Sequence, residues 1–212
     1  KMKMFDLTMH TPEPTSRAYS MANSPAEGNI IMLNIRIATP PFDRAAGAFA
    51  PVNPGICSSF IFSRKPGDKV TISGPYGEFF LRETNNEMMF IGGGAGMAPM
   101  RSHIFNLFHT IHTDRKEAPY VDEFNKIQEE NPNFHWTLAL DRPDPVADAA
   151  GVAYKPGFVH QVIFENYLKN HENPEDIEYY LCGPPMMIQA VTKMLYDLGV
   201  PDENVMYDNF GG

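Results

Sequence analysis

The spacing of apolar residues divides the chain into two parts with different periodicity. Over Ile30–Ala38, every second residue from Ile31 to Ile37 is aliphatic, a period typical of a half-buried β-strand. Further short strands are predicted at Arg17–Ala22 and Lys69–Ser73, with turn signals rich in glycine and proline between them. Several short strands joined by turns predict a small antiparallel β-barrel for the first part.

After Glu83 the pattern becomes an alternation of strands and helices. The predicted strands are Met88–Ile91, Phe134–Leu140, Glu178–Cys182 and Val205–Phe210, and the predicted helices are Pro99–Thr110, Tyr120–Glu130, Val159–Leu168 and Met186–Gly199. Such alternation is typical of a doubly wound sheet of parallel strands. We therefore expect an α+β chain of two domains, with an antiparallel β-barrel at 1–83 followed by an α/β doubly wound, parallel-sheet nucleotide domain at 84–212.

One strand is missing from this alternation. Two predicted helices, ending near Thr110 and beginning near Tyr120, follow each other directly, although a right-handed βαβ unit has a strand between its helices. The stretch His109–Pro119 contains no β-rich run. We expect that residues are missing within 109–119, and that the barrel has also lost strands at its N-terminal side.

Composition excludes several classes of function. The formal net charge of −9 argues against a nucleic-acid partner, which would need a basic face. The two cysteines, Cys57 and Cys182, are too few for a metal cluster, so no metal site is expected. No apolar run approaches the roughly 20 residues of a membrane helix. We expect a chain that does not span a membrane and works in a reducing, cytosolic environment.

The run Gly92–Pro99 is the strongest candidate binding site. It joins a predicted strand to a predicted helix, where glycines let the backbone approach a pyrophosphate and the helix N-terminus offers free N–H groups. The common dinucleotide pattern has a glycine where this chain has Pro99, but proline is well tolerated at a helix start. The candidate binding residues are Gly92, Gly93, Gly94, Gly96, Met97 and Pro99. The alternative is a tight turn without a ligand.

Two segments of the first part carry candidate flavin-binding side chains. On the predicted strand at Arg17, that guanidinium could fork onto a phosphate, Tyr19 could lie on a flat cofactor ring, and Ser20 could donate a hydrogen bond to a ring nitrogen. Gly55, followed by two hydroxyls at Ser58 and Ser59, could begin a helix whose N-terminus holds a second pyrophosphate. The alternatives are an ordinary strand and an ordinary N-cap.

A third candidate lies at the end of a strand in the second part. Cys182, Gly183 and Pro184 follow a predicted strand and precede a helix. Ligands of doubly wound sheets gather at the carboxyl ends of the strands, which would place Cys182 at the mouth of the crevice. The alternative is a cysteine that acts as a small buried apolar residue.

Taken in order, these motifs resemble the ferredoxin–NADP reductase superfamily over nearly the whole chain. The motifs are Arg17-Ala-Tyr-Ser20, Gly55-x-x-Ser58, Gly74-Pro-Tyr-Gly77, Gly92–Pro99 and Cys182-Gly-Pro-Pro185. Three longer stretches, Arg17–Asn23, Gly92–His103 and Asp208–Gly212, are similar to the family of F subunits in the sodium-translocating NADH:quinone oxidoreductases.

The resemblance implies a role for each matching residue. It implies that Arg17, Tyr19 and Ser20 contact the phosphate, the ring and the reactive edge of FAD, that Asn34, Arg36 and Ala38 line its phosphate and ribitol side, and that Gly55, Ser58 and Ser59 hold its pyrophosphate. It implies that Gly92–Pro99 takes the NADH pyrophosphate, that Cys182, Gly183 and Pro184 lie beside the nicotinamide, and that Phe210 covers the flavin and moves aside. Ser20, Cys182 and Phe210 are thus the expected catalytic residues.

The function implied is electron input from NADH. Hydride passes from NADH to FAD, and electrons then leave one at a time to a [2Fe-2S] centre that the family carries in a part not represented in this chain. The resemblance also implies ubiquinone as the final acceptor, sodium transport, partner subunits of a membrane respiratory complex, and a place at the cytoplasmic face of the bacterial inner membrane. The alternatives are a soluble NAD(P)H-dependent ferredoxin or flavodoxin reductase and a flavin-binding interaction module without turnover.

Overall fold

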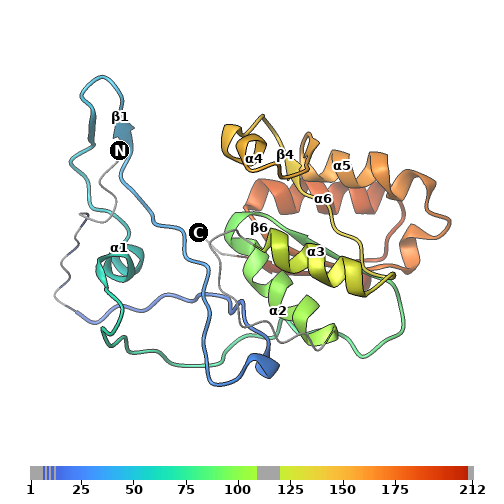
Figure 1. Cartoon of the computed structure of the whole chain (residues 1–212), viewed down its shortest axis with the longest axis horizontal. Helices are drawn as coiled ribbons and strands as arrows, with labels where there is room; N and C mark the ends of the chain where they lie inside the picture. Colours follow the sequence, from blue (N-terminus) through green and yellow to red (C-terminus); the bar gives the residue numbers. More distant parts are fainter. Residues whose placement is uncertain (1–6, 8, 10, 12, 109–119, 210–212) are drawn as a thin grey trace. The chain divides into compact units, whose positions relative to one another are not determined.

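The computed structural model of the chain describes residues 7, 9, 11, 13–108 and 120–209 (Figure 1). Contacts divide it into two compact units, one formed by Lys1–Ser20 with Leu33–Glu78 and the other by Met21–Met32 with Phe79–Gly212. The segment Met21–Met32 therefore packs within the second unit, although its sequence neighbours on both sides belong to the first. The domain boundary expected at Glu83 remains a prediction.

The first unit contains one short hairpin and one helix among its described residues. Strand β1 (Phe42–Asp43) pairs antiparallel with β2 (Ala48–Phe49), and the Phe42 and Phe49 rings meet edge to face at 5.2 Å. The Asp43 carboxylate closes the turn by accepting hydrogen bonds from the Ala45 and Ala46 N–H groups. Helix α1 (Ile56–Ser63) follows at Gly55.

Three predicted strands do not form regular strands in the described structure. Arg17–Ala22, Ile30–Ala38 and Lys69–Ser73 contain no regular strand in the part of the chain that the structure describes, and several of their apolar side chains, such as Ile31 and Ile72, are exposed. Period-two patterning favours an extended backbone, but a ladder also needs a partner strand in register. Within residues 13–78 no closed barrel is described, so the barrel remains a prediction.

The core of the second unit is a sheet of three parallel strands. Strand β6 (Glu178–Gly183) lies between β3 (Met88–Gly92) and β7 (Val205–Asn209). Every residue of β6 is buried. This is the arrangement expected of a central parallel strand covered on both faces.

Alternate residues of these strands feed two separate cores. Tyr179 and Leu181 point to one face, where they pack with residues of α5 (Val159–Asn166) and α6 (Pro185–Asp197). Tyr180 and Cys182 point to the other face and pack with Met100 of α2 (Met97–Leu107). Figure 1 shows α5 and α6 on one side of β6 and α2 on the other. The parallel strands and two helical layers confirm the α/β character expected of this part.

Two further helices and a second small sheet complete this unit. Helix α2 spans Met97–Leu107, and α3 (Val121–Glu130) packs against it through Phe124 and Ile127. Strand β4 (Ala139–Leu140) pairs parallel with β5 (Lys155–Pro156), and α4 (Pro145–Ala149) lies between them in sequence. The short 3-10 helices are Pro25–Glu27, Gly94–Gly96, Leu168–Asn170, Pro174–Asp176 and Asp202–Asn204.

The strand predicted at Phe134–Leu140 is much shorter than expected. Only Ala139–Leu140 is a strand, because Phe134 is drawn into the α2–α3 core, where its ring packs against Phe108 and Phe124. The expected loss of residues within 109–119 lies outside the described residues and remains a prediction. Among the helices that the structure describes, none combines the length and the apolar character needed to cross a membrane.

Candidate nucleotide-binding sites

The glycine run and the Cys182 motif meet at the carboxyl edge of the parallel sheet. Gly92, at the end of β3, is the register partner of Cys182 near the end of β6. The Gly93 N–H donates to the Cys182 carbonyl at 2.9 Å, and the Gly96 N–H donates to the Gly93 carbonyl at 3.0 Å. Ligands of doubly wound sheets bind at this edge. The structure thus brings together two predicted motifs that are almost ninety residues apart in the sequence.

Most glycines of this edge are required by packing within the protein. A Cβ on Gly96 would lie 2.0 Å from the Cys182 carbonyl oxygen, and a Cβ on Gly93 would lie 2.5 Å from the Met187 sulfur. Gly92 and Gly183 are equally crowded. Gly94 is different: its φ of +58° is left-handed and a Cβ there would meet nothing within 4 Å. Close packing therefore largely explains why several glycines follow one another in this turn. Gly94 is the one that faces open space.

The helix after this turn has an N-terminus suited to an anion. Helix α2 begins at Met97, and its N-cap residue, Gly96, offers no side chain that could satisfy the first N–H groups. The 3-10 helix Gly94–Gly96 leads directly into α2, so the Met97 N–H already donates to the Gly94 and Ala95 carbonyls, and it is the positive end of the helix dipole that favours a negative group. Pro99 is the third helical residue, where no N–H has an intrahelical partner in any case. The positive end of the dipole, next to the open side of Gly94, therefore fits a dinucleotide pyrophosphate.

Cys182 is completely buried in this structure. Burial raises the pKa of its thiol to about 12, and the nearby Asp208 carboxylate contributes in the same direction. The sulfur is therefore a neutral thiol at physiological pH and packs with Met100 and Tyr180. Gly183 follows with a φ of +159° and leads into Pro184, which precedes the first residue of α6. The structure therefore agrees with the description of Cys182 as a small buried residue, at the edge where ligands gather.

In the first unit, three predicted FAD residues come together at the start of α1. The Ser58 hydroxyl accepts a hydrogen bond from the Ala38 N–H at 3.1 Å and donates to the Gly55 carbonyl at 3.3 Å. The Gly55 N–H donates to the Ala38 carbonyl at 2.9 Å. A Cβ on Gly55 would lie 2.7 Å from the Ala38 Cβ, so glycine is needed there. Ser58 thus fixes the shape of this site through the backbone.

Ser59 is the residue of this site whose hydroxyl group makes no hydrogen bond to a described residue. Its side chain is 1% exposed, and its hydroxyl oxygen has no hydrogen-bond partner among the described residues. Buried hydroxyls without a partner are rare because they cost free energy. Together with an N-cap that lacks a side-chain hydrogen bond at Gly55, this orphaned group fits a phosphate-bearing cofactor such as FAD.

The remaining predicted flavin residues are less strongly tied to α1. Arg17 is exposed and donates to the Ser16 carbonyl at 2.7 Å. Tyr19 is half-buried, and burial raises its pKa, with Cys57 of α1 adding to the rise and Arg17 opposing it. Asn34 is half-buried and Arg36 is exposed. Ser20 is half-buried and interacts with another group of the protein. Phe210 lies outside the described residues.

Sequence reasoning missed a buried ion network and a buried histidine in the second unit. Arg101 of α2 pairs with Glu27 and Glu123, and the sequence held only one signal of it, the capping-box spacing from Ser24 to Glu27. His103 lies among the Phe79, Phe90 and Tyr180 rings, and burial lowers its pKa to about 4. No local pattern distinguishes either residue from a surface position on a helix.

Comparison with known proteins matches both parts of the chain to nucleotide-binding families. Residues 3–81 match the family model of the oxidoreductase FAD-binding domain, and residues 90–193 match that of the oxidoreductase NAD-binding domain. The chain is 54% identical to the F subunit of the Na(+)-translocating NADH-quinone reductase of Methylococcus capsulatus and 54% identical to that of Yersinia enterocolitica. These alignments cover 100% of this chain and 53% of each relative, so the chain spans about half the length of the curated relatives it matches.

Solved structures agree with this assignment. The cytochrome P450 reductase GcoB of Amycolatopsis superposes with a TM-score of 0.66 at 25% identity, over 91% of this chain and 55% of that one. A ferredoxin-NADP+ reductase variant from Plasmodium falciparum has the same fold, with a TM-score of 0.68 at 20% identity, over 95% of this chain and 80% of that one. With an FAD-binding and an NAD-binding domain in this order, the chain belongs to the ferredoxin–NADP reductase superfamily.

Proposed function

We propose that this chain is the electron-input part of a sodium-translocating NADH:quinone oxidoreductase, in which it oxidises NADH with FAD as the acceptor. The observation that carries the proposal is the joint carboxyl edge of β3 and β6, where the glycine turn, the Cys182 motif and the α2 N-terminus converge. The 54% identity to the F subunits of such enzymes supports NADH as the donor. When bound, the two cofactors supply the chemistry, a hydride moving from nicotinamide to flavin.

The second unit provides the dinucleotide site. We assign the pyrophosphate to the N-terminal end of α2, where the helix dipole is positive, with Gly94 leaving room for it and Gly92, Gly93 and Gly96 holding the turn against the sheet. Met97 and Pro99 form the first turn of that helix. Cys182, Gly183 and Pro184 line the nicotinamide side, where a neutral thiol adds no charge beside the ring.

The first unit provides the flavin site. Ser59 and the N-terminal N–H groups of α1 hold the pyrophosphate, and Gly55, Ser58 and Ala38 fix the backbone that presents them. Arg17, Tyr19 and Ser20 bind the phosphate, the ring and its reactive edge, while Asn34 and Arg36 line the ribitol side. The resemblance assigns to Phe210, outside the described residues, the role of a ring that gives way to nicotinamide. We assign the extended segments of this unit to a β-barrel that holds the cofactor.

The onward path lies outside this chain. Electrons leave singly to a [2Fe-2S] centre in the remaining half of the full-length protein, and from there travel through partner subunits toward quinone. Sodium transport belongs to that assembly. The flavoprotein part faces the cytoplasm at the bacterial inner membrane, where NADH is available.

Anaerobic addition of NADH to the FAD-loaded chain tests the proposal. We expect the visible absorption of the oxidised flavin to bleach, with NADH at least about tenfold more effective than NADPH in kcat/KM. A flavin that binds and stays oxidised with both dinucleotides would leave only the interaction module without turnover. A preference for NADPH would favour the soluble reductase instead.

A further inference from the structure

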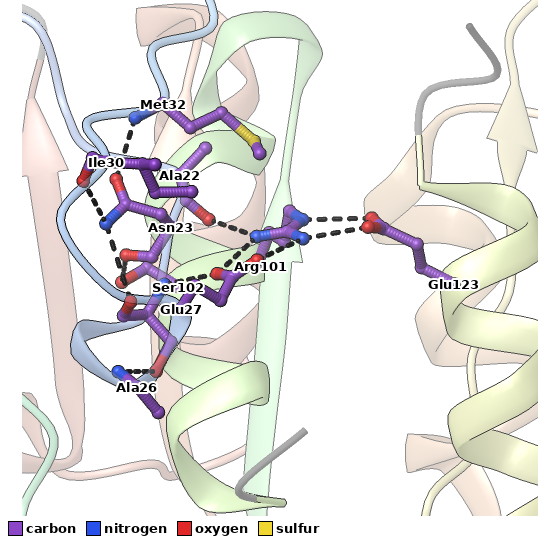
Figure 2. A network of polar contacts seen from close by, with 10 residues as sticks. Ala22, Asn23, Ala26, Glu27, Ile30, Met32, Arg101, Ser102 and Glu123 are labelled. Atoms are coloured by element: carbon purple, nitrogen blue, oxygen red, sulfur yellow. Dashed lines mark hydrogen bonds and ion pairs between the residues drawn. The ribbon is translucent and has the colours of Figure 1, made fainter. Parts of the chain in front are cut away.

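A buried guanidinium joins helix α2 to a segment that continues into the predicted flavin residues. The Arg101 side chain is 1% exposed, and its two carboxylate partners come from different elements: Glu27, 4% exposed, and Glu123 of α3, 23% exposed. Figure 2 shows Arg101 between them, with Ala22 and Asn23 beside it. All of these residues belong to the second unit.

The hydrogen bonds of Arg101 use its full donor capacity. A guanidinium has five N–H groups. Nε donates to the Glu123 carboxylate at 2.9 Å, and Nη2 donates to Glu123 at 2.8 Å and to Glu27 at 2.9 Å. Nη1 donates to Glu27 at 2.9 Å and to the Ala22 carbonyl at 2.8 Å. The group therefore fixes two carboxylates and one backbone carbonyl in a single planar geometry.

The segment held in this way is itself well ordered by polar contacts. Glu27 also accepts a hydrogen bond from the Ser24 N–H at 2.6 Å, which completes a capping box. The Asn23 side chain accepts from the Met32 N–H at 2.8 Å and donates to the Ile30 carbonyl at 3.0 Å, and the Ser102 hydroxyl donates to the Asn23 carbonyl at 2.8 Å. Arg101 and Ser102 thus hold Met21–Met32 at both its start and its middle (Figure 2).

Chain connectivity gives this segment its significance. Peptide bonds join it directly to Ser20 at one end and to Leu33 at the other. The predicted flavin residues Tyr19 and Ser20 therefore precede it immediately, and Asn34 follows it by two residues. On the other side of the network, Arg101 lies one helical turn after Met97, where α2 leaves the dinucleotide turn.

We propose that Arg101 is a positioning residue for hydride transfer, because through Glu27 and Ala22 it fixes the segment between the two flavin-binding stretches to the helix that begins at the dinucleotide turn. This rests on the proposed function. Apolar packing could hold the same elements together, but a buried ion pair with a planar fork fixes direction as well as distance. Hydride transfer requires that accuracy, since small displacements of reacting groups reduce its rate steeply.

Two variants that each remove one carboxylate from the same guanidinium test the proposal in the full chain. Glu27→Gln weakens the link to Met21–Met32, whereas Glu123→Gln weakens only the link to α3 and is the matched control. Ser102→Ala removes a single hydrogen bond to Met21–Met32 and therefore weakens the link to this segment less than Glu27→Gln does.

Hydrogen exchange without any nucleotide gives the first readout. In Glu27→Gln, we expect amides of Arg17–Ser20 and Leu33–Ala38 to exchange at least about tenfold faster, and in Glu123→Gln within about twofold of the unmutated chain. The second readout is flavin reduction by NADH. We expect Glu27→Gln to lower kcat about tenfold or more, with KM and FAD content within about twofold, and Glu123→Gln to change neither.

Equal effects of the two glutamine variants on exchange and on kcat would overturn the proposal, because the network would then be stabilising only. Should Glu27→Gln not fold, Ser102→Ala decides by the same criteria, with exchange and kcat changes of about threefold expected. If NADH does not reduce the flavin of the unmutated chain, the proposed function fails, while the exchange measurement still decides whether Arg101 positions the segment.

Discussion

The Cys182 carbonyl oxygen lies 2.0 Å from the place that a Cβ on Gly96 would occupy. The carbonyl carbon and the Gly183 nitrogen are almost as close, at 2.3 and 2.7 Å. All three are backbone atoms of the strand end, which cannot swing away as a side chain could. The glycine turn and the Cys182 motif are therefore interlocked, and neither can change shape without the other.

Replacing Gly96 with alanine should damage both folding and dinucleotide binding. We expect Gly96→Ala to lose about 1–3 kcal/mol of unfolding free energy through overpacking, and to raise the Kd for NADH at least about tenfold. Urea denaturation and NADH titration measure the two effects. Gly151→Ala is the control for binding: a Cβ there meets nothing within 4 Å, and its left-handed φ of +68° makes the substitution cost about 1–2 kcal/mol of stability away from this edge. A Gly96→Ala protein that binds NADH as tightly as the control would show that this edge is not the dinucleotide site.

The adjacent serines of α1 should separate structure from cofactor binding. Because the Ser59 hydroxyl has no partner among the described residues, Ser59→Ala should leave the unfolding free energy of the FAD-free chain unchanged or slightly higher. It should raise the Kd for FAD about tenfold. Ser58→Ala loses the bond to the Ala38 N–H and should cost the FAD-free chain about 1 kcal/mol. Flavin fluorescence and thermal unfolding measure these quantities, and unchanged FAD affinity in Ser59→Ala would contradict the assignment.

His103 should make the second unit sensitive to acid. Its pKa is lowered by burial from 6.5 to about 4. The unfolded chain therefore takes up the proton first, so the contribution is complete above about pH 6.5 and is lost as pH falls toward about 4. This lowering of the His103 pKa corresponds to at most about 3 kcal/mol of unfolding free energy.

Urea denaturation as a function of pH in His103→Gln tests this linkage. The variant should lose less unfolding free energy than the unmutated chain over that pH interval. His135→Gln, at an exposed position, should behave as the unmutated chain does. Identical acid profiles for the His103→Gln protein and the unmutated chain would contradict a buried neutral imidazole.

The second unit could be predicted from the sequence because its signals are local. The apolar run at Met88 and that at Glu178–Cys182 gave strands whose observed bounds differ by one residue each, because Gly92 and Gly183 still belong to the strands. Buried parallel strands are continuous apolar runs and need no knowledge of their partner to be found.

Other features could not be predicted because they depend on distant partners. Ile30–Ala38 has a strand period, but in the described structure a single backbone hydrogen bond, from the Ala22 N–H to the Met32 carbonyl, joins it to another predicted strand, and a period alone does not specify a partner in register. The place of Met21–Met32 in the second unit depends on Arg101, a residue more than seventy positions away. Close packing rather than a ligand accounts for Gly96, which local glycine statistics could not reveal.

Removing the charge of Arg101 should be costly at neutral pH. Burial alone would lower its pKa, but the hydrogen bonds to Glu123 and Glu27 outweigh that effect and raise the pKa above its ordinary value. Arg101→Met leaves two carboxylates near each other with no cation, so we expect a loss of about 3–5 kcal/mol of unfolding free energy. Lys193→Met, which breaks an exposed pair with Asp197, should cost less than about 1 kcal/mol. Equal losses measured by urea denaturation would contradict the buried network.

The central claim is that one chain binds both nucleotides and moves a hydride between them. The direct measurement is anaerobic stopped-flow mixing of the FAD-loaded chain with NADH carrying deuterium at both C4 positions, compared with ordinary NADH. We expect the flavin to bleach with both, and more slowly with the deuterated donor, because the C4–hydrogen bond breaks in that step. A flavin that remains oxidised with either donor would contradict the account.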